Sequence, residues 1–255
     1  MRLPRRRERW WGRRQPRFDG PPVLLLHAGG MDGRMWRPLA ERIEDRYWVI
    51  VPDLRGHGTT PLPPEEFSHV DDLLGLLDDL KVERTAVVGC SMGGHVALEL
   101  ATAAPERVNA LVLLASSLDV DDWSDEIRRY WSQEHELVEA GDIDGAVELN
   151  VRTWGREGET DELVAEMVRT SLELQVGVEA PERELSVDLA SIAVPTLAVS
   201  GGLDFADFAR IADRIAAEVP GAQRAEVADA GHLIPLERPD ETAELLVPFL
   251  EAVGS

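Results

Sequence analysis

Short apolar runs alternate with longer amphipathic stretches along most of the chain. Six runs, mostly rich in Val, Leu and Ala and bounded by Gly, Pro or Asp, predict strands, and the continuous ones predict strands buried on both faces. They cover residues 23–26, 48–51, 86–89, 110–115, 196–200 and 223–228. Apolar residues at three-to-four spacing predict helices over residues 34–45, 70–80, 92–104, 206–219 and 242–253. The alternation predicts an α/β fold, with a mostly parallel central sheet and helices on both faces.

One stretch, from about residue 119 to residue 189, breaks this alternation. Helical patterns recur there without a convincing strand, over residues 124–140, 142–154 and 160–178. Asp142 and Thr160 occupy positions typical of helix N-caps. An all-helical insertion in a βα alternation is typical of a lid over the carboxyl edge of the sheet, where ligands bind. We therefore expect a helical cap at residues 119–189, inserted before the predicted strand at residues 196–200. It divides a core made of residues 19–118 and 190–255.

Composition narrows the class of protein. The 255 residues are 44% hydrophobic and 29% charged, which suits a globular protein with a sizeable core. No apolar run approaches the roughly 18 residues of a membrane-spanning helix. Cys90 is the only cysteine, which excludes an intramolecular disulfide and a cysteine-built zinc site. We expect a cytoplasmic protein that needs no metal or other cofactor.

Charge is distributed unevenly along the chain. The formal net charge is −22, yet residues 1–17 hold eight arginines and one glutamate. The acidic body repels nucleic acid and anionic membranes at long range, so neither is an expected partner. No apolar segment of signal-peptide length follows the arginines, which argues against a secretory signal. We expect residues 1–18 to form a disordered basic leader; the alternative is an arm that contacts an acidic partner.

The strongest chemical signal is the run Gly89-Cys90-Ser91-Met92-Gly93, between a predicted strand and a predicted helix. Such a turn exposes the serine hydroxyl at the sheet edge, and its glycines let the turn close without Cβ clashes. The helix that follows directs its N-terminus at developing negative charge. Ser91 is therefore the candidate nucleophile, and the alternative is a tight turn with an idle serine. We interpret Cys90 as a small buried hydrophobe.

Together with four further segments, this turn makes the chain from Pro21 onwards resemble the α/β-hydrolase superfamily. The resemblance is strongest to 3-oxoadipate enol-lactonase-like hydrolases, small esterases and cofactor-free haloperoxidases. The further segments are His27-Ala28-Gly29-Gly30, Asp53-Leu54-Arg55-Gly56-His57-Gly58, Gly201-Gly202-Leu203-Asp204 and Ala230-Gly231-His232. The family order of nucleophile, acid and histidine implies a triad of Ser91, Asp204 and His232.

Each member of this triad has a chemical role. A serine hydroxyl is a poor nucleophile until a base takes its proton, and His232 is the candidate base. Asp204 would hold the imidazole tautomer and stabilise the imidazolium. Asp207, on the opening turn of the next predicted helix, and Asp229 are rival acids.

The resemblance also implies an oxyanion hole made by the backbone N–H groups of Gly29 and Met92. The family commonly has glycine where Ala28 stands and a bulkier residue at Gly29, but backbone donors tolerate such side-chain changes. The family also usually begins with two antiparallel strands before the loop that carries the oxyanion donor, whereas the basic leader of this chain shows no strand-like alternation.

The remaining histidines have structural interpretations. By resemblance, His27 supports the oxyanion loop, and His57 is a loop anchor. The others lie on or beside predicted helices and are surface or packing residues: His69, His95 and His135. No histidine pair with a carboxylate indicates a metal site.

The predicted cap decides the substrate. Its large aromatic residues are Trp123, Tyr130, Trp131 and Trp154. Trp154 ends a predicted helix beside Gly155 and is the candidate substrate-binding residue. Arg152 and Arg156 flank it, and an arginine facing Ser91 would suit a substrate carboxylate, whereas the acidic body disfavours an anionic substrate.

The sequence predicts a serine hydrolase that cleaves a small carboxylic ester or lactone through an acyl-enzyme. Its expected partner is a small-molecule substrate. Two alternatives share the scaffold: a C–C bond hydrolase or perhydrolase with the same triad, and a small-molecule receptor that signals by lid movement.

Overall fold

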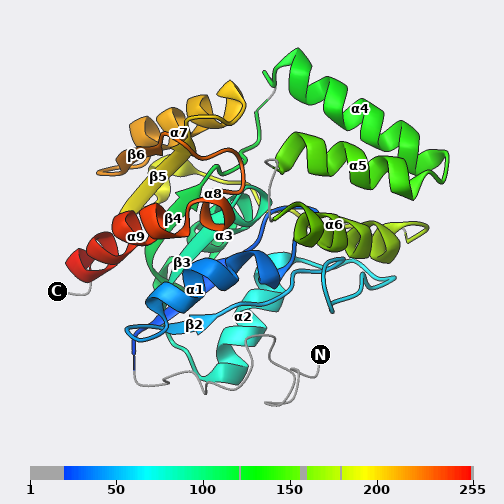
Figure 1. Ribbon diagram of the computed structural model, residues 1–255. Helices are drawn as coiled ribbons and strands as arrows, with labels where there is room; N and C mark the ends of the chain where they lie inside the picture. Colours follow the sequence, from blue (N-terminus) through cyan, green and yellow to red (C-terminus); the bar gives the residue numbers. More distant parts are fainter. Residues whose placement is uncertain (1–19, 121, 156–159, 179, 254–255) are drawn as a thin grey trace.

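A six-stranded parallel sheet forms the centre of the computed structural model, which describes residues 20–120, 122–155, 160–178 and 180–253 (Figure 1). Its strands are β1 (Pro22–Leu26), β2 (Trp48–Ile50), β3 (Thr85–Cys90), β4 (Val108–Leu114), β5 (Thr196–Gly201) and β6 (Gln223–Val227). The order across the sheet is β2-β1-β3-β4-β5-β6, and every neighbouring pair is parallel. The strand predictions and the α/β fold class are confirmed. The basic leader, residues 1–18, lies outside the described residues.

Helices cover both faces of the sheet because successive side chains of a strand point to opposite faces. Val23 and Leu25 pack in one buried cluster, whereas Leu24 and Leu26 pack in another. The first cluster includes residues of α1 (Arg37–Ile43) and α9 (Pro239–Val253). The second includes residues of α2 (His69–Leu80), α3 (Met92–Ala103) and α7 (Ala206–Glu218).

Several helix boundaries differ from the sequence-based expectation. The stretch 34–45 folds as a 3-10 turn, η1 (Gly33–Trp36), followed by α1. The last helix begins at Pro239, three residues before the expected start, because proline suits the first position of a helix. The short α8 (Ile234–Glu237) was not predicted, since one turn carries no readable periodicity. Two further 3-10 turns are η2 (Pro105–Arg107) and η3 (Leu189–Ser191).

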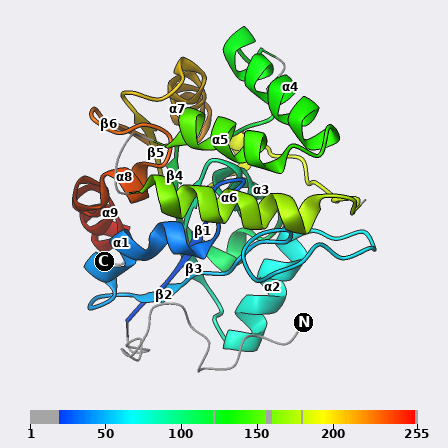
Figure 2. The same ribbon diagram turned by 45° about the vertical axis from the view of Figure 1, so that its right-hand side comes forward.

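Within the described ranges, three α-helices lie between β4 and β5, where the sequence predicts a cap. They are α4 (Asp125–Glu139), α5 (Ile143–Trp154) and α6 (Asp161–Gln175). Figures 1 and 2 show them side by side outside the central sheet, with α5 between α4 and α6. None of the helices in the described ranges is both long and apolar enough to cross a membrane.

The ends of the cap helices follow local hydrogen bonding. Asp142 accepts from the Gly145 N–H at 2.9 Å, which confirms the N-cap expected there. The N-cap expected at Thr160 is only partly right: the residue precedes α6, but its side chain makes no capping hydrogen bond and its backbone is already helical. Helix α6 ends at Gln175, before the expected residue 178, because the backbone leaves the helical region at Val176, whose ψ is 124°, and Gly177 follows with a φ of +74°.

Candidate active site

The candidate site residues gather at the carboxyl edge of the sheet, where the strand order reverses. Strand β1 has β2 on one side and β3 on the other. The chain leaves β1 into the loop of residues 27–31 and leaves β3 into Ser91, so both segments emerge at this switch point. Ligands of open α/β sheets bind in such crevices. Asp204 and His232 follow β5 and β6 and lie at the same edge.

Ser91 sits in a strained turn between β3 and α3. Its φ of 51° and ψ of −117° are rarely adopted by a residue with a side chain. Two backbone hydrogen bonds fix the turn: the Ser91 N–H donates to Leu114 O at 3.0 Å, and Ser117 N–H donates to Ser91 O at 3.1 Å. The tertiary structure therefore imposes the geometry that a nucleophile elbow needs.

The glycines around Ser91 are required by close packing. A Cβ at Gly89 would overlap the carbonyl oxygen of Gly93, and a Cβ at Gly93 would overlap the carbonyl oxygens of Leu26 and His27. The start of α3 therefore lies directly against the end of β1. No larger residue could bring the serine this close to the loop after β1.

His232 and Asp204 form a buried hydrogen-bonded pair. The Nδ1 of His232 lies 2.8 Å from Oδ2 of Asp204, and the two side chains are 6% and 1% exposed. Since a carboxylate can only accept, Nδ1 carries the proton and Nε2 of a neutral ring is left as an acceptor. The rings of Trp154 and Phe208 cover the imidazole, with centroid distances of 4.5 and 4.2 Å.

The loop after β1 brings Gly29 next to Met92. Met31 N–H donates to Ala28 O at 3.1 Å, and Gly30 supplies the φ of +72° that this turn requires. A Cβ built on Gly29 would lie 3.8 Å from the Cβ of Met92. Residues 29 and 92, predicted to donate to an oxyanion, therefore face each other across a short gap.

Buried His27 holds this loop in place. Its Nδ1 lies 2.9 Å from Ala28 O, and its Nε2 accepts from Leu54 N–H at 2.9 Å. Burial, followed by the nearby His57, lowers the pKa of His27 to about 3. The ring is therefore neutral with its proton on Nδ1, and both nitrogens are committed to loop structure.

A cavity of about 360 Å³ joins the core residues to the cap. Ser91 and His232 lie on its wall, Trp154 of α5 lines it, and Asp204 lies behind His232. Gly29 and Met92 also line it. The structure thus brings Ser91, His232, Gly29, Met92 and Trp154 to one cavity of ligand size.

Comparison with known proteins identifies the family. Residues 23–245 match the model of the "Alpha/beta hydrolase family". The chain belongs to the alpha/beta hydrolase family. The protein is therefore a hydrolase.

Relatives within this family include esterases and lactonases. The chain is 27% identical to a pimeloyl-[acyl-carrier protein] methyl ester esterase of Aeromonas hydrophila, over 91% of this chain and 96% of that enzyme. It is 24% identical to 3-oxoadipate enol-lactonase 1 of Acinetobacter baylyi, over 92% of this chain and 90% of that enzyme. A thermophilic esterase from Thermogutta terrifontis superimposes with a TM-score of 0.74 at 28% identity, covering 92% of this chain and 91% of that structure.

Among the rival acids, neither Asp207 nor Asp229 occupies the position beside His232. Asp207 accepts from Ser124 N–H at 2.9 Å and from Arg210 at 3.0 Å, so it anchors the entry to α4. Asp229 is exposed in the turn after β6. The hydrogen bond from His232 goes to Asp204.

The other histidines differ in their surroundings. His57 lines the cavity, but its Nδ1 bonds Arg55 O at 2.8 Å and its Nε2 accepts from Gly30 N–H at 3.3 Å, as expected of a loop anchor. Burial lowers its pKa. His69 is buried beside Glu182, with 3.5 Å between His69 Nε2 and Glu182 Oε1. His135 is exposed on α4.

Neither Cys90 nor Arg152 lines the cavity. Cys90 is fully buried, its Sγ lies 3.7 Å from His232 O, and burial raises the pKa of its thiol. Arg152 is exposed and lines a separate surface groove between α4 and α5. Arg156 lies outside the described residues. Among the described residues that line the cavity there is no arginine or lysine.

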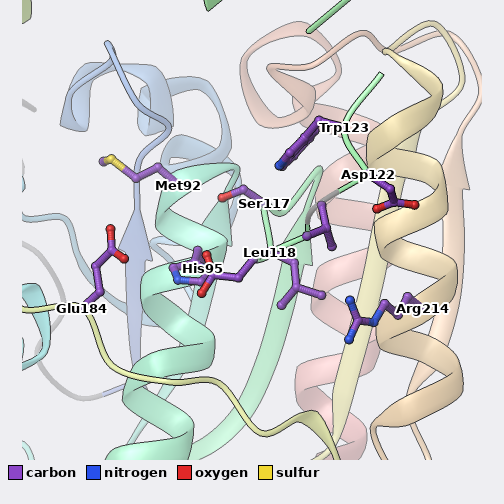
Figure 3. Close-up of a pocket in the computed structure, with 10 residues that line it drawn as sticks. Met92, His95, Ser117, Leu118, Asp122, Trp123, Glu184 and Arg214 are labelled. Carbon is purple, nitrogen blue, oxygen red and sulfur yellow. The ribbon is translucent and has the colours of Figure 1, made fainter. Parts of the chain in front are cut away.

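A wider groove adjoins the cavity at Met92, Ser117 and Trp123, which line both. It has a volume of about 940 Å³. Figure 3 shows Glu184 on one side and Arg214 on the other. Arg214 pairs with Glu218 at 2.9 Å. The groove therefore offers an open, charged approach to the edge of the cavity.

Sequence reasoning missed a set of polar cavity residues in the cap. They are Glu134, Asn150, Ser171 and Gln175. A signal exists in the pattern: each lies four residues from another cavity residue on the same helix, as Glu134 does from Tyr130 and Asn150 does from Trp154. The sequence signal for such a residue is therefore a polar side chain within the buried stripe of an amphipathic helix.

Within the described ranges, no group of three His, Cys, Asp or Glu is arranged to hold a metal.

Proposed function

We propose that the protein cleaves a small carboxylic ester or lactone through an acyl-enzyme formed on Ser91, with His232 as base and Asp204 as orienting acid. The observation that carries the proposal is the strained Ser91 turn in one cavity with a histidine whose Nδ1 is bonded to a buried carboxylate. The names of the relatives, an esterase and an enol-lactonase, support the substrate class.

In the first half of the reaction, Ser91 Oγ attacks the substrate carbonyl carbon while its proton passes to His232 Nε2. Asp204 stabilises the imidazolium that forms. The carbonyl oxygen becomes an oxyanion, and the N–H groups of Gly29 and Met92 donate to it. Fixed backbone donors stabilise such charge without reorganising. His232 then gives its proton to the leaving oxygen, the ester C–O bond breaks, and an acyl-Ser91 ester remains.

In the second half, water takes the place of Ser91 as the nucleophile. His232 takes a proton from the water, whose oxygen attacks the acyl carbon, and a second oxyanion forms at the same donors. When it collapses, the C–O bond to Ser91 breaks and the serine oxygen regains the proton from His232. The carboxylic acid leaves and the free enzyme is restored, so the cycle consumes one ester and one water.

The cap defines the substrate pocket in this proposal. Trp154 forms the wall beside His232, and a cavity of about 360 Å³ accommodates a small acyl or lactone ring. We propose residues 119–189 as the cap and residues 19–118 with 190–255 as the core that carries the triad.

Hydrolysis of p-nitrophenyl acetate and a panel of small lactones tests the proposal. The wild-type protein should turn over at least one class, and Ser91→Ala should reduce the rate to background. Ser116→Ala is the matched control, because Ser116 is a buried serine beside the elbow that does not line the cavity. Loss of activity in Ser116→Ala alone, or full activity in Ser91→Ala, would contradict the proposed nucleophile. Binding of small esters without turnover would favour a receptor.

A further inference from the structure

Three polar residues of the cap form a hydrogen-bonded cluster on the cavity wall. Tyr130 and Glu134 come from α4, and Asn150 comes from α5. The Tyr130 hydroxyl lies 2.8 Å from Asn150 Oδ1 and 3.0 Å from Glu134 Oε1. Asn150 Nδ2 donates to Glu134 Oε1 at 2.5 Å and to Ala146 O at 2.9 Å. These contacts fix the three side chains relative to one another.

The donors of this cluster are already used. The bond to the Ala146 carbonyl, which can only accept, fixes the orientation of the Asn150 amide, and both of its hydrogens are committed. Tyr130 has one hydroxyl hydrogen, shared between Asn150 and Glu134, and burial raises its pKa so that it stays protonated. Within the described part of the chain, the hydrogen bonds that hold the Glu134 carboxylate both reach Oε1, and Oε2 is left as an acceptor. The cluster can therefore accept a further hydrogen bond but has no hydrogen left to donate.

The cluster lies close to the reacting centre. Asn150 Oδ1 would be 4.0 Å from a Cβ built on Gly30, in the loop that carries the proposed oxyanion donor. Tyr130 packs edge-on against Trp154 at 4.9 Å, and Trp154 covers His232 at 4.5 Å. A single ring therefore separates the cluster from the proposed base. A substrate held at Ser91 can reach it with a short chain.

Charge at the cavity has one sign. Apart from its two histidines, the only ionisable acid or base with a formal charge among the described lining residues is Glu134. No lining cation in that set neutralises it, and the whole chain carries a net charge of −22. A substrate carboxylate at this wall would meet a like charge and would lose water without gaining a partner.

We propose that Glu134, held by Tyr130 and Asn150, is a specificity-determining site that accepts a hydrogen bond from a hydroxyl or amide N–H of the substrate. The inference rests on the proposed function and deepens it. The preferred substrates are uncharged esters or lactones that carry a hydrogen-bond donor a few atoms from the reacting carbonyl. Esters that carry a free carboxylate at that position are poor substrates.

Paired substrates test the inference on the wild-type enzyme. p-Nitrophenyl esters of N-acetyl amino acids with one to three methylenes between nitrogen and carbonyl are compared with their N-methyl counterparts, which lack only the donor. At one linker length, kcat/KM for the N–H ester should exceed that of the N-methyl ester by about tenfold, because a lost hydrogen bond to a charged group costs at least that factor. The p-nitrophenyl ester of hydrogen succinate should be slower than that of butanoate.

Variants assign the effect to Glu134. In Glu134→Gln, the ratio of kcat/KM for the N–H ester over the N-methyl ester should fall several-fold. The ratio of kcat/KM for the hydrogen succinate ester over the butanoate ester should rise. Glu136→Gln is the matched control, because it makes the same change at an exposed position of the same helix outside the cavity. It should keep both wild-type ratios. Equal rates for all N–H and N-methyl pairs in the wild type, or ratios unchanged in Glu134→Gln, would overturn the inference.

The two proposals fail in different ways. If the wild-type enzyme hydrolyses p-nitrophenyl acetate through Ser91 but shows no donor preference, only the inference is wrong. If no ester or lactone is hydrolysed, or if hydrolysis survives Ser91→Ala, the proposed function fails and the inference fails with it. Wild-type ratios need no variant to fold, so the inference remains testable if Glu134→Gln is unstable.

Discussion

Replacement of Trp154 by alanine separates its role in the pocket from its role in packing. The indole lines the cavity and packs against four other rings, with centroid distances of 4.5 Å to His232, 4.9 Å to Tyr130, 5.4 Å to Phe205 and 6.3 Å to Phe208. It is also half-buried, so its loss should cost stability. Because Trp→Ala changes in full cores cost about 3–5 kcal/mol, we expect about 3 kcal/mol for Trp154→Ala.

The vacated volume should admit longer acyl groups. Butanoate has two more methylenes than acetate, and each buried methylene contributes about 0.8 kcal/mol. The ratio of kcat/KM for butanoate over acetate esters should therefore rise by up to about 15-fold. Hydrolysis itself should persist, since Ser91, Asp204 and His232 are unchanged.

The assay combines an ester chain-length series with urea unfolding of the same variant. Phe205→Ala is the matched control: Phe205 packs against Trp154 but does not line the cavity that holds Ser91. It should lower the free energy of unfolding and leave the chain-length ratio unchanged. If Trp154→Ala is destabilised and its chain-length ratio is also unchanged, Trp154 only packs the cap and our pocket assignment is refuted.

Three further predictions follow from individual contacts. Asp204→Asn should lower kcat by about four powers of ten through the wrong imidazole tautomer, and a comparable loss in Asp207→Asn instead would show that the acid is misassigned. In urea unfolding, Gly93→Ala should lower the free energy of unfolding by about 1–3 kcal/mol or more, because the added Cβ would overlap two backbone carbonyls. Gly75→Ala, where the Cβ meets open space inside α2, should instead raise it by about 0.5–1 kcal/mol. Equal effects of the two substitutions would contradict the packing argument. Burial lowers the pKa of His27 from 6.5 to about 3, so between these pH values the unfolded chain binds a proton at this histidine that the native chain does not. His27 alone should therefore lower the free energy of unfolding by about 1.4 kcal/mol for each pH unit below 6.5, and the slope of that free energy against pH should be shallower by about this amount in His27→Gln.

The features predicted most accurately from the sequence are those that depend only on the local pattern of residues. The buried runs at β3 and β4 are continuous and bounded by turns, so their position follows from periodicity alone. The turn around Ser91 was equally readable, because its glycines are required within the same five residues. Asp204 and His232 came from the order of motifs, and their contact depends on β5 and β6 being neighbours.

What could not be predicted depends on contacts between elements. Glu134 and Asn150 lie 16 positions apart, and their hydrogen bond exists only because α4 packs on α5. Thr160 has the composition of an N-cap, yet its backbone is already helical, so its side chain makes no capping bond. A polar residue within an apolar helical stripe marks a site, but its partner is set by tertiary packing.

The position of covalent labelling by a fluorophosphonate probe tests the central claim most directly. Such probes react with a serine hydroxyl that is activated by a neighbouring base. Peptide mapping should place the adduct on Ser91 in the wild type and in Ser116→Ala, and labelling should disappear in Ser91→Ala. An adduct on another residue such as Cys90, or no adduct on an active enzyme, would contradict the account.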